Sequence, residues 1–215
     1  RIAQQAQKYG VELLSAVGAT GIESSQGSSR ITLSTGKVIS AGAVVISTGS
    51  NYRRTNAPGE ADLIGAGVHF CATCDGPFYK EAEELVVLGA GNSGLEEGLF
   101  LTKFGKHVTI FERSDKVAGS KILQNKVAEH PNMELRLNSE VISFNANSDG
   151  RFASLTISGP GGETYDHNAA AVFVFIGLDP NTGWLNGLVE LDEQGFITTD
   201  RNMETSVPGV FAAGD

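Results

Sequence analysis

A glycine-rich turn between an apolar strand and a helix constrains the fold most. The strand Glu84–Gly89 is predicted to be buried, and Gly89-Ala90-Gly91-Asn92-Ser93-Gly94 then opens a predicted helix over Asn92–Phe104. This G-x-G-x-x-G pattern in a strand–turn–helix context is typical of dinucleotide binding. The first glycine allows the tight turn, the second lets a pyrophosphate approach the backbone, and the third lets helix and strand pack closely. The alternative is a glycine-rich turn that holds no ligand.

The residues that follow the turn predict a parallel sheet. Strands are expected at His107–Phe111 and Met133–Leu137, with a helix over Gly119–His130 between them. This strand–helix–strand order means parallel neighbours with right-handed crossovers. Three short segments then predict an antiparallel meander inserted in the parallel sheet, and a fully buried strand returns afterwards. They are Val141–Asn145, Ala153–Ser158, Glu163–Asp166 and the returning strand Ala171–Gly177.

The flanking regions carry weaker patterns. Two apolar runs that end in Gly49 and Gly214 resemble each other, which indicates one domain interrupted by another. Residues 50–67 are polar and turn-rich, and they are predicted to link the two domains. The remaining expectations are a helix over 1–9, a strand at Val11–Leu14, a hairpin of Arg30–Leu33 and Lys37–Ser40, a buried strand within Ala43–Gly49, and a strand pair around Gly195-Phe196-Ile197.

Charge and hydropathy exclude some classes of protein. The formal net charge is −9 over 215 residues, whereas nucleic-acid binding requires clustered Lys and Arg. The longest apolar runs have the length of strands, so no membrane span is expected. The first residues lack the apolar core of a signal peptide, and a cytoplasmic location is therefore expected.

Glu112 ends the second predicted strand, about 20 residues after the glycine-rich turn. A carboxylate at this position accepts a hydrogen bond from the 2′-hydroxyl of an adenosine ribose and repels a 2′-phosphate. The alternative is a solvated glutamate at the end of a strand.

The chain has two cysteines, in the run Cys71-Ala72-Thr73-Cys74. A redox dithiol is the favoured interpretation, because this spacing brings two sulfurs together and lowers the pKa of one thiol. A zinc site would need about four ligands, and only His69 offers a third. A buried structural pair is disfavoured by the polar neighbours. Asp75 is placed to act as an acid–base group, or it is a turn residue before Gly76-Pro77.

The segment Gly67-Val68-His69-Phe70-Cys71-Ala72-Thr73-Cys74-Asp75-Gly76-Pro77-Phe78 resembles the active-site segment of low-molecular-weight thioredoxin reductases. The resemblance extends over nearly the whole chain. It includes the turn Gly89–Gly94, Glu96-Glu97 on the following helix, Ile176-Gly177, Pro180-Asn181-Thr182 and the closing run Pro208–Asp215.

The resemblance implies an FAD protein of two dinucleotide-binding domains, with the nicotinamide domain inserted in the FAD domain. The expected fold is an α/β, Rossmann-like three-layer ββα sandwich. Residues 1–54 and 179–215 would belong to a partial FAD domain, and residues 55–178 would form the nicotinamide domain with the dithiol. Beyond the glycine-rich turn, the residues expected to bind cofactor are Glu97, Glu112, Arg113, Ile176 and Gly177 for the nucleotide, and Thr48, Gly49 and Asp215 for the flavin.

The same resemblance assigns roles around the dithiol. Cys74 would face the flavin as the charge-transfer thiolate, Cys71 would attack the disulfide of the partner, and Asp75 would be the acid–base residue. A homodimer is also implied. The glycine-rich FAD fingerprint that opens the family is missing before residue 70, and the segment that normally follows Asp215 is missing too. We therefore expect a fragment that binds FAD weakly or not at all and is inactive alone.

The nucleotide site departs from the family pattern. Members that use NADPH carry a His-Arg-Arg run after the second strand and another Arg four residues on, and these cations pair with the 2′-phosphate. This chain has Glu112-Arg113-Ser114 there, and Ala118 in place of the last Arg. NADH is therefore predicted over NADPH, although Lys116 and Lys121 offer some phosphate binding. Leu178 replaces a family His, with no consequence that the sequence explains.

Four functions remain open at this point. The first is a flavin-dependent disulfide reductase that acts on thioredoxin or a similar dithiol protein. The second is the reductase component of a peroxiredoxin system. The third uses the same dithiol and flavin with a donor such as ferredoxin, and the fourth is a nucleotide-binding module without catalysis.

Overall fold

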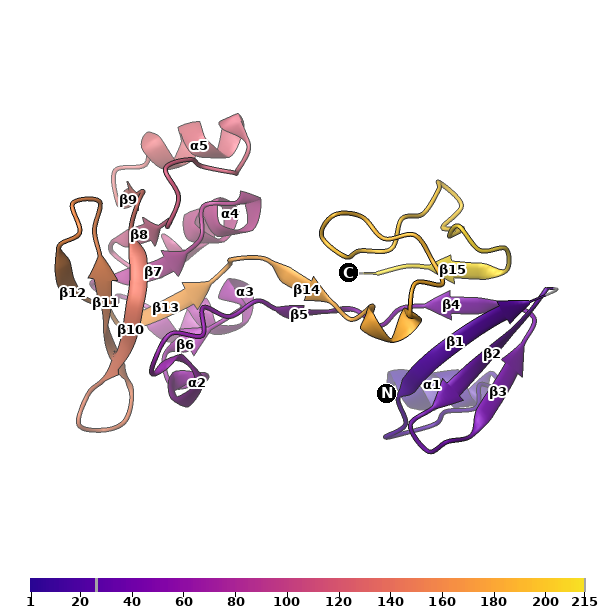
Figure 1. Ribbon diagram of the computed structural model, residues 1–215. Coiled ribbons are helices and arrows are strands. Elements are labelled where there is room, and N and C mark those ends of the chain that lie inside the picture. Colours follow the sequence, from indigo (N-terminus) through magenta and orange to yellow (C-terminus); the bar gives the residue numbers. More distant parts are fainter. Residues whose placement is uncertain (26, 215) are drawn as a thin grey trace. The chain divides into compact units, whose positions relative to one another are not determined.

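The computed structural model describes residues 1–25 and 27–214, which form two compact units (Figure 1). One unit is the continuous segment Tyr52–Leu178. The other combines Arg1–Asn51 with the segment from Asp179 onward. The chain thus begins in the discontinuous unit, forms the whole continuous unit, and then returns to the discontinuous unit.

The continuous unit is built on a five-stranded sheet in the order β6-β13-β7-β8-β9. Each neighbouring pair is parallel, as predicted for the strands that follow the glycine-rich turn. The strands are β6 (Val68–His69), β7 (Leu85–Leu88), β8 (Val108–Phe111), β9 (Met133–Arg136) and β13 (Ala171–Val174).

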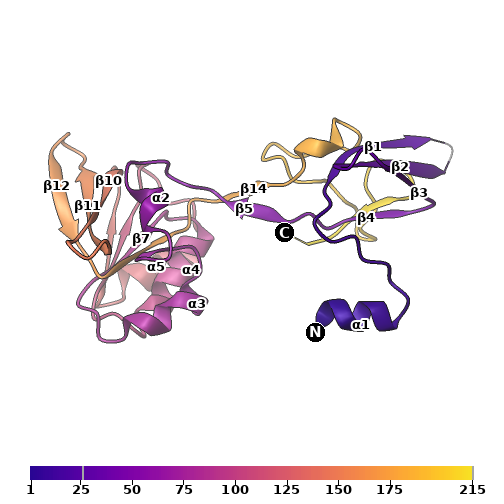
Figure 2. The same cartoon turned by 90° about the horizontal axis from the view of Figure 1, so that it is seen from below.

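The two faces of this sheet are covered by different layers (Figure 2). Because successive side chains of a strand point to opposite faces, Val86 and Leu88 join one apolar cluster while Leu85 and Val87 join another. The first cluster includes Leu155 of an antiparallel sheet, and the second includes residues of the helices. The covering elements are β10 (Glu140–Ala146), β11 (Phe152–Ser158) and β12 (Thr164–Asn168) on one face, and α4 (Asn92–Leu101) and α5 (Lys121–Ala128) on the other.

The predicted three-layer ββα sandwich is therefore confirmed. One detail differs, because the meander is inserted only in the sequence. In space, β10, β11 and β12 form a separate three-stranded sheet instead of joining the parallel one. The inward side chains of β11 lie against the sheet face, and this burial holds the two sheets together.

The prediction of a linker over residues 50–67 is wrong for most of that segment. Leu63 of the short helix α2 (Glu60–Leu63) belongs to the core of the continuous unit. Glu60 is 1% exposed, and its carboxylate accepts hydrogen bonds from Thr55 and from the backbone N–H of Asn56. Polar residues usually signal a surface linker, but here they satisfy one buried carboxylate.

The discontinuous unit contains an antiparallel sheet β1-β2-β3 and a parallel pair β4–β15. Its core joins residues of both chain segments, such as Ile22, Ile46, Leu185 and Val210. The pairing of β4 with β15 is consistent with the similarity of the two apolar runs that contain them. The elements are α1 (Ile2–Lys8), β1 (Ala19–Ser25), β2 (Ser28–Leu33), β3 (Val38–Ala41), β4 (Val44–Ile46), the 3₁₀ turn η2 (Gly183–Leu185) and β15 (Val210–Ala212).

Three sequence predictions fail in this unit. Residues 11–14 are exposed and form no strand, because apolar side chains without a pairing partner do not make a ladder. The run Ala43–Gly49 forms the strand β4, but Val45 at its centre is 66% exposed instead of buried. The expected strand pair around Gly195 is reduced to one bridge between Leu191 and Ile197.

The two chain passages between the units pair with each other as β5 (Ser50–Tyr52) and β14 (Leu178–Pro180). Two short elements complete the continuous unit, α3 (Ala72–Asp75) and the 3₁₀ turn η1 (Gly76–Tyr79). Within residues 1–25 and 27–214, none of the helices has the length and hydropathy needed to cross a membrane.

Candidate active site

Four strand ends bring the predicted site residues of the continuous unit to one edge of its sheet. Cys71 follows β6, Ile176 follows β13, Gly89 follows β7 and Glu112 follows β8. Strands β8 and β9 lie on one side of β7, while β13 and β6 lie on the other. From β7 the chain continues to β8 on one side, and it later returns to β13 on the other side, so the strand order reverses between β7 and β13. Open α/β sheets bind ligands at the carboxyl ends of their strands at such a point.

The glycines of the turn after β7 are required for different reasons. Gly89 has φ +101°, and a Cβ there would lie 2.5 Å from the carbonyl oxygen of Phe175. A Cβ on Gly94 would lie 1.9 Å from the carbonyl oxygen of Gly89, so helix and strand could not approach. By contrast, a Cβ on Gly91 would meet nothing within 4 Å. Gly91 therefore faces open space, whereas Gly89 and Gly94 are needed for packing.

The N-terminus of α4 faces the same space. Its N-cap is Gly91, which offers no side-chain cap, and the first N–H groups of a helix lack intrahelical partners. The carboxamide oxygen of Asn92 does not cap the helix either, because it accepts the backbone N–H of Ser120 at 2.7 Å. Ser93 is exposed. A phosphate is the kind of ligand that such a helix end favours.

Glu112 is held rigidly beside this turn. One carboxylate oxygen accepts the N–H of Ala90 at 2.9 Å, and the other accepts the N–H and the hydroxyl of Ser114, both at 2.9 Å. Burial opposes ionisation, but the hydrogen bonds from Ser114 and Ala90 outweigh it and lower the pKa of Glu112 below its usual value. A fixed negative charge therefore lies where the adenosine ribose is predicted.

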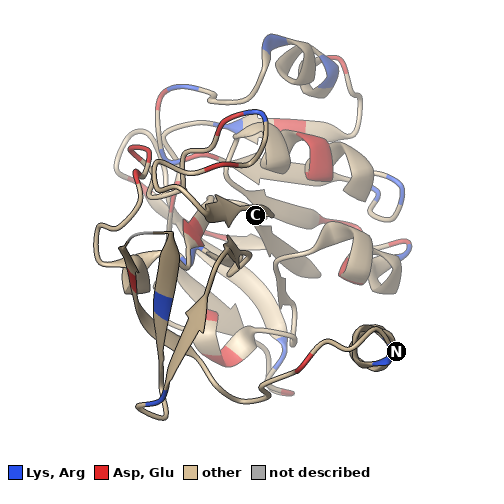
Figure 3. Cartoon of the chain, turned by 90° about the vertical axis from the view of Figure 1, so that its right-hand side faces the viewer, with Lys and Arg blue, Asp and Glu red and all other residues tan. Residues whose placement is uncertain are grey.

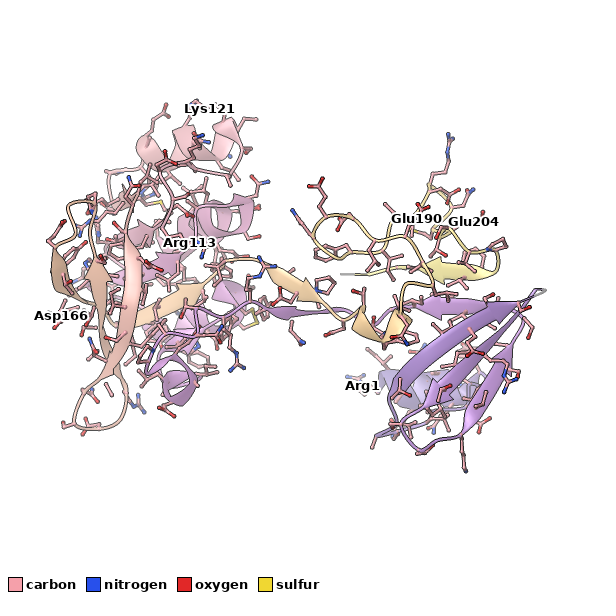
Figure 4. The ribbon with its side chains drawn as sticks, viewed as in Figure 1. Arg1, Arg113, Lys121, Asp166, Glu190 and Glu204 are labelled. Atoms are coloured by element: carbon pink, nitrogen blue, oxygen red, sulfur yellow. A yellow bond between two sulfur atoms is a disulfide. The ribbon has the colours of Figure 1, made fainter. Side chains whose placement is uncertain are left out.

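The cations predicted to offset this carboxylate are exposed. Arg113 lies two residues after the end of β8, and Lys121 lies at the start of α5 (Figure 4). Lys116 and Ala118 are also exposed, on the loop between these elements. This loop is anchored on the glycine-rich turn, because the N–H of Gly119 donates to the carbonyl oxygen of Ala90 at 3.0 Å.

Of the other predicted residues, Ile176 lies close to the turn, Gly177 has a backbone conformation that favours glycine, and Glu97 lies farther along α4. The Cγ2 of Ile176 is 3.3 Å from the place that a Cβ of Gly89 would occupy, and Gly177 adopts φ +111°. Glu97 is half-buried on α4, where Glu96 is exposed. Figure 3 shows where acidic and basic residues lie along the ribbon. Burial and the charge of Glu96 raise the pKa of Glu97.

Cys71 and Cys74 are joined by a disulfide. Cys71 is the N-cap of α3 and is half-buried, whereas Cys74 is exposed. The sulfur of Cys71 accepts the N–H of Cys74 at 3.2 Å. Helix α3 contacts α4, and Gly76 packs tightly against Leu101 and Phe104. The helix that begins at the glycine-rich turn thus also supports the disulfide.

Asp75 is linked to two residues that the sequence did not connect with it. The Nδ1 of His69 lies 3.3 Å from a carboxylate oxygen of Asp75, and its Nε2 lies 2.7 Å from the hydroxyl of Tyr79. Burial lowers the pKa of His69 although Asp75 acts to raise it, and burial followed by the charge of Asp75 raises the pKa of Tyr79. The sequence singled out His69 only as a zinc ligand, and no motif pointed to Tyr79.

The predicted flavin residues belong to the discontinuous unit. The hydroxyl of Thr48 donates to the carbonyl oxygen of Asn181 at 2.9 Å, and the N–H of Asn181 donates to the carbonyl oxygen of Gly49 at 2.9 Å. Two motifs far apart in sequence are thus hydrogen-bonded to each other. Thr48, Gly49 and Gly214 line one open cavity of about 220 Å³. Asp215 lies outside the described residues.

Comparison with known proteins connects these features. The family of pyridine nucleotide-disulphide oxidoreductases matches residues 2–215. A component of the alkyl hydroperoxide reductase of Staphylococcus aureus is 38% identical over 217 residues, which cover 100% of this chain and 42% of that protein. The chain therefore spans less than half the length of the curated relatives that it matches.

Solved structures agree with this family. The thioredoxin reductase of Giardia duodenalis has a TM-score of 0.82 and 34% identity, covering 100% of this chain and 70% of that one. The thioredoxin reductase of Streptococcus pyogenes has a TM-score of 0.78 and 33% identity, covering 99% of this chain and 68% of that one. The resemblance inferred from the residues around Cys71 and Cys74 is thereby confirmed.

Proposed function

Because the chain belongs to the pyridine nucleotide-disulphide oxidoreductase family, we propose that it forms part of a flavoprotein disulfide reductase. Electrons pass from a pyridine nucleotide through FAD to the disulfide of Cys71 and Cys74, and then to thioredoxin or a similar dithiol protein. The observation that carries the proposal is the position of this disulfide. It follows β6 at the same sheet edge as the dinucleotide turn after β7, and it rests on the helix that the turn opens.

Cys71, Cys74 and Asp75 have different roles in the proposed reaction. Reduction of the disulfide adds two electrons, breaks the S–S bond and leaves one sulfur on each cysteine. Exposed Cys74 is the sulfur we assign to the flavin side, and Cys71 is the one that attacks the disulfide of the partner. Asp75 follows Cys74 directly, and we assign to its carboxylate the role of accepting the proton of the Cys74 thiol and returning it.

We assign the continuous unit to the nicotinamide nucleotide and the discontinuous unit to FAD. The support for the nucleotide is the space in front of Gly91 and the uncapped start of α4. The support for the flavin is the cavity beside Thr48 and Gly49. When bound, FAD supplies the two-electron carrier between the nucleotide and the disulfide.

We further propose that the nucleotide is NADH. The carboxylate of Glu112 is held by hydrogen bonds from Ala90 and Ser114 and has a lowered pKa. It therefore remains ionised at neutral pH, where it suits a ribose hydroxyl and repels a 2′-phosphate. Ala118 offers no compensating cation, while Arg113 and Lys116 are exposed to solvent.

A second candidate acceptor is favoured by the curated relatives. The alkyl hydroperoxide reductase component of Staphylococcus aureus matches this chain over its whole length at 38% identity. The dithiol would then pass its electrons to a peroxiredoxin, a protein that reduces hydroperoxides. The two candidates share every step up to the reduced dithiol and differ only in the disulfide that Cys71 attacks.

The first test is an anaerobic titration of the full-length protein with NADH or NADPH, followed by bleaching of the flavin absorbance. The proposal expects bleaching at lower concentrations of NADH, followed by the appearance of two thiols per chain. Bleaching by neither nucleotide would refute the nicotinamide-linked reductase and leave a donor such as ferredoxin. A thiol count that never changes would refute the redox role of the disulfide.

The acceptor is identified by coupling the reduced protein to thioredoxin or to a peroxiredoxin. Cys74→Ser is expected to abolish turnover with either acceptor and to leave nucleotide binding intact. Equal turnover of this variant would contradict the assignment of Cys74. A homodimer and a cytoplasmic location stay predictions of the family resemblance, which gel filtration and cell fractionation can test.

A further inference from the structure

His69 connects the acid–base candidate Asp75 to Tyr79. Its side chain is almost fully buried, with 8% of the residue exposed. The Nδ1 atom is 3.3 Å from the Asp75 carboxylate, and the Nε2 atom is 2.7 Å from the Tyr79 hydroxyl. Both ring nitrogens therefore have a polar partner, one on α3, which carries Cys74, and one on η1, which follows α3.

The sheet fixes where this imidazole lies. His69 is the last residue of β6, and its backbone pairs with Phe173 of β13. Its ring packs on the ring of Phe173 with centroids 5.4 Å apart, and the ring of Tyr79 meets Phe173 edge-on at 6.1 Å. Packing on both sides leaves the imidazole few alternative orientations. The rigid sheet edge thus holds the imidazole toward α3, which carries Cys74 and Asp75.

The partners determine which nitrogen carries the proton. A neutral imidazole has one N–H donor and one acceptor nitrogen. The Tyr79 hydroxyl can donate to Nε2, while an ionised carboxylate can only accept, so the proton belongs on Nδ1. Burial lowers the pKa of His69 and therefore favours this neutral form. In this tautomer the protonated nitrogen is Nδ1, the atom that lies 3.3 Å from the Asp75 carboxylate.

We propose that His69 is a positioning residue that orients the carboxylate of Asp75 as the base for Cys74, with Tyr79 selecting the tautomer. The inference rests on the proposed function of the dithiol. The ionisable groups around the imidazole are Asp75 of α3 and Tyr79 of η1, and the charge of Arg151 acts on Tyr79. The face toward β13 is the apolar ring of Phe173.

A reaction of the dithiol in which the flavin takes no part isolates the role of His69. The full-length protein, reduced beforehand, is mixed with the aromatic disulfide dithionitrobenzoate. The sulfur of Cys71 attacks the reagent, forming a mixed disulfide and releasing one aryl thiolate. Cys74 then loses its proton to Asp75 and attacks the Cys71 sulfur, which closes the disulfide and releases the second aryl thiolate. Two electrons pass from the dithiol to the reagent, and the release of the second thiolate reports the assisted step.

Two variants of His69 separate orientation from packing. The amide nitrogen of His69→Asn falls near the position of Nδ1 and can still donate to Asp75. The amide of His69→Gln falls near the position of Nε2 and keeps only the contact with Tyr79. We expect His69→Gln to slow the second release about 10-fold to 100-fold near neutral pH, the factor for a lost hydrogen bond to a charged group. His69→Asn is expected to recover most of that loss.

The pH profile distinguishes a base from a structural effect. Above the ordinary thiol pKa of about 8.5 the thiolate forms without assistance, so the deficit of His69→Gln should vanish there. Tyr79→Phe keeps the aromatic packing but removes the hydroxyl that favours the Nδ1–H tautomer of His69. It should show a smaller deficit, of about a few-fold, with the same dependence on pH.

The outcomes are distinguishable. If the unmodified protein never releases a second aryl thiolate, the proposed function fails and the inference fails with it. If it does, and His69→Gln keeps the unmodified profile or loses rate equally at every pH, only the role of His69 is refuted. Equal rates for His69→Asn and His69→Gln would also overturn it, because only the former retains the donor. An unchanged Tyr79→Phe variant would refute the tautomer argument.

Discussion

Replacement of Glu112 by Gln should convert the nucleotide preference. The substitution removes one negative charge and keeps the length of the side chain. In the unmodified protein the carboxylate is held by the N–H groups of Ala90 and Ser114, which also lower its pKa. Its charge is therefore present across the whole neutral range of pH. We expect the variant to bind NADPH more tightly and NADH slightly less tightly.

The size of the effect follows from the charges. At about 5 Å and an effective dielectric constant of about 20, two unit charges repel by about 3 kcal/mol. Because Glu112 is partly exposed, solvent screening reduces this to about 1.4 to 2.7 kcal/mol, which corresponds to about 10-fold to 100-fold in affinity for NADPH. Loss of the hydrogen bond to the ribose hydroxyl should weaken NADH by only about 3-fold to 10-fold.

The assay is an anaerobic titration of the full-length protein with each nucleotide at several salt concentrations. The preference of the unmodified protein for NADH should decrease as salt rises, because added ions screen the repulsion. Glu83→Gln is the matched control. It removes the same charge, but Glu83 precedes β7 and so lies at the opposite end of the sheet from Glu112.

Ala118→Arg gives an independent check, since it adds a cation on the exposed loop and leaves the hydrogen bonds of Glu112 intact. It should strengthen NADPH binding and leave NADH nearly unchanged. An unchanged ratio of affinities in both Glu112→Gln and Ala118→Arg would refute the electrostatic argument. A similar change in Glu83→Gln would show that net charge, and not this carboxylate, sets the preference.

Three further predictions follow from the same contacts. Gly91→Ala should change the free energy of unfolding by less than about 0.5 kcal/mol but weaken nucleotide binding about 10-fold or more. Gly94→Ala should lower the free energy of unfolding by about 3 kcal/mol or more, because its Cβ would lie 1.9 Å from the Gly89 oxygen. Nucleotide titration measures the binding and urea denaturation the stability, and equal stabilities of the two variants would contradict the packing argument. Glu60→Gln should lose about 2 kcal/mol in urea denaturation, because the buried carboxylate accepts several hydrogen bonds, and a neutral effect would count against them. Burial opposes ionisation of Glu84, but hydrogen bonds from neighbouring side chains prevail and lower its pKa. The ionised carboxylate therefore stabilises the folded state above the unfolded pKa of about 4.5, and this stabilisation is lost as pH falls through the lower pKa of the folded state. The difference in free energy of unfolding between the unmodified protein and Glu84→Gln should close below that pH, and a difference independent of pH would refute the linkage.

Short-range patterns in the sequence predicted much of the continuous unit. The strand before Gly89 and the helix after it follow from local apolar spacing and from glycines that only this geometry requires. The dithiol could also be found from the sequence, because the spacing of Cys71 and Cys74 is itself the constraint on their sulfurs. Glu112 could be placed at the carboxyl edge of the sheet, because a residue that follows a parallel strand must lie there.

Other features needed partners that are distant in the sequence. The apolar residues at 11–14 read as a strand, but strands require a neighbour, and these residues have no ladder. Residues 50–67 read as a linker, although Glu60 and Leu63 are buried once α2 lies on the core. Local composition does not report whether another part of the chain will satisfy a polar group or cover an apolar one.

The sequence by itself therefore predicted the chemical groups that this protein offers: two cysteines spaced as a dithiol, a glycine-rich turn after a buried strand, and an acid where a ribose is expected. Only the tertiary structure decided how these groups cooperate. It placed β13 between β6 and β7, and so brought His69 against Phe173 and turned its imidazole toward Asp75 and Tyr79. The physical reason is that a motif is set by neighbours along the chain, whereas sheet order and side-chain partners are set by which surfaces are buried together.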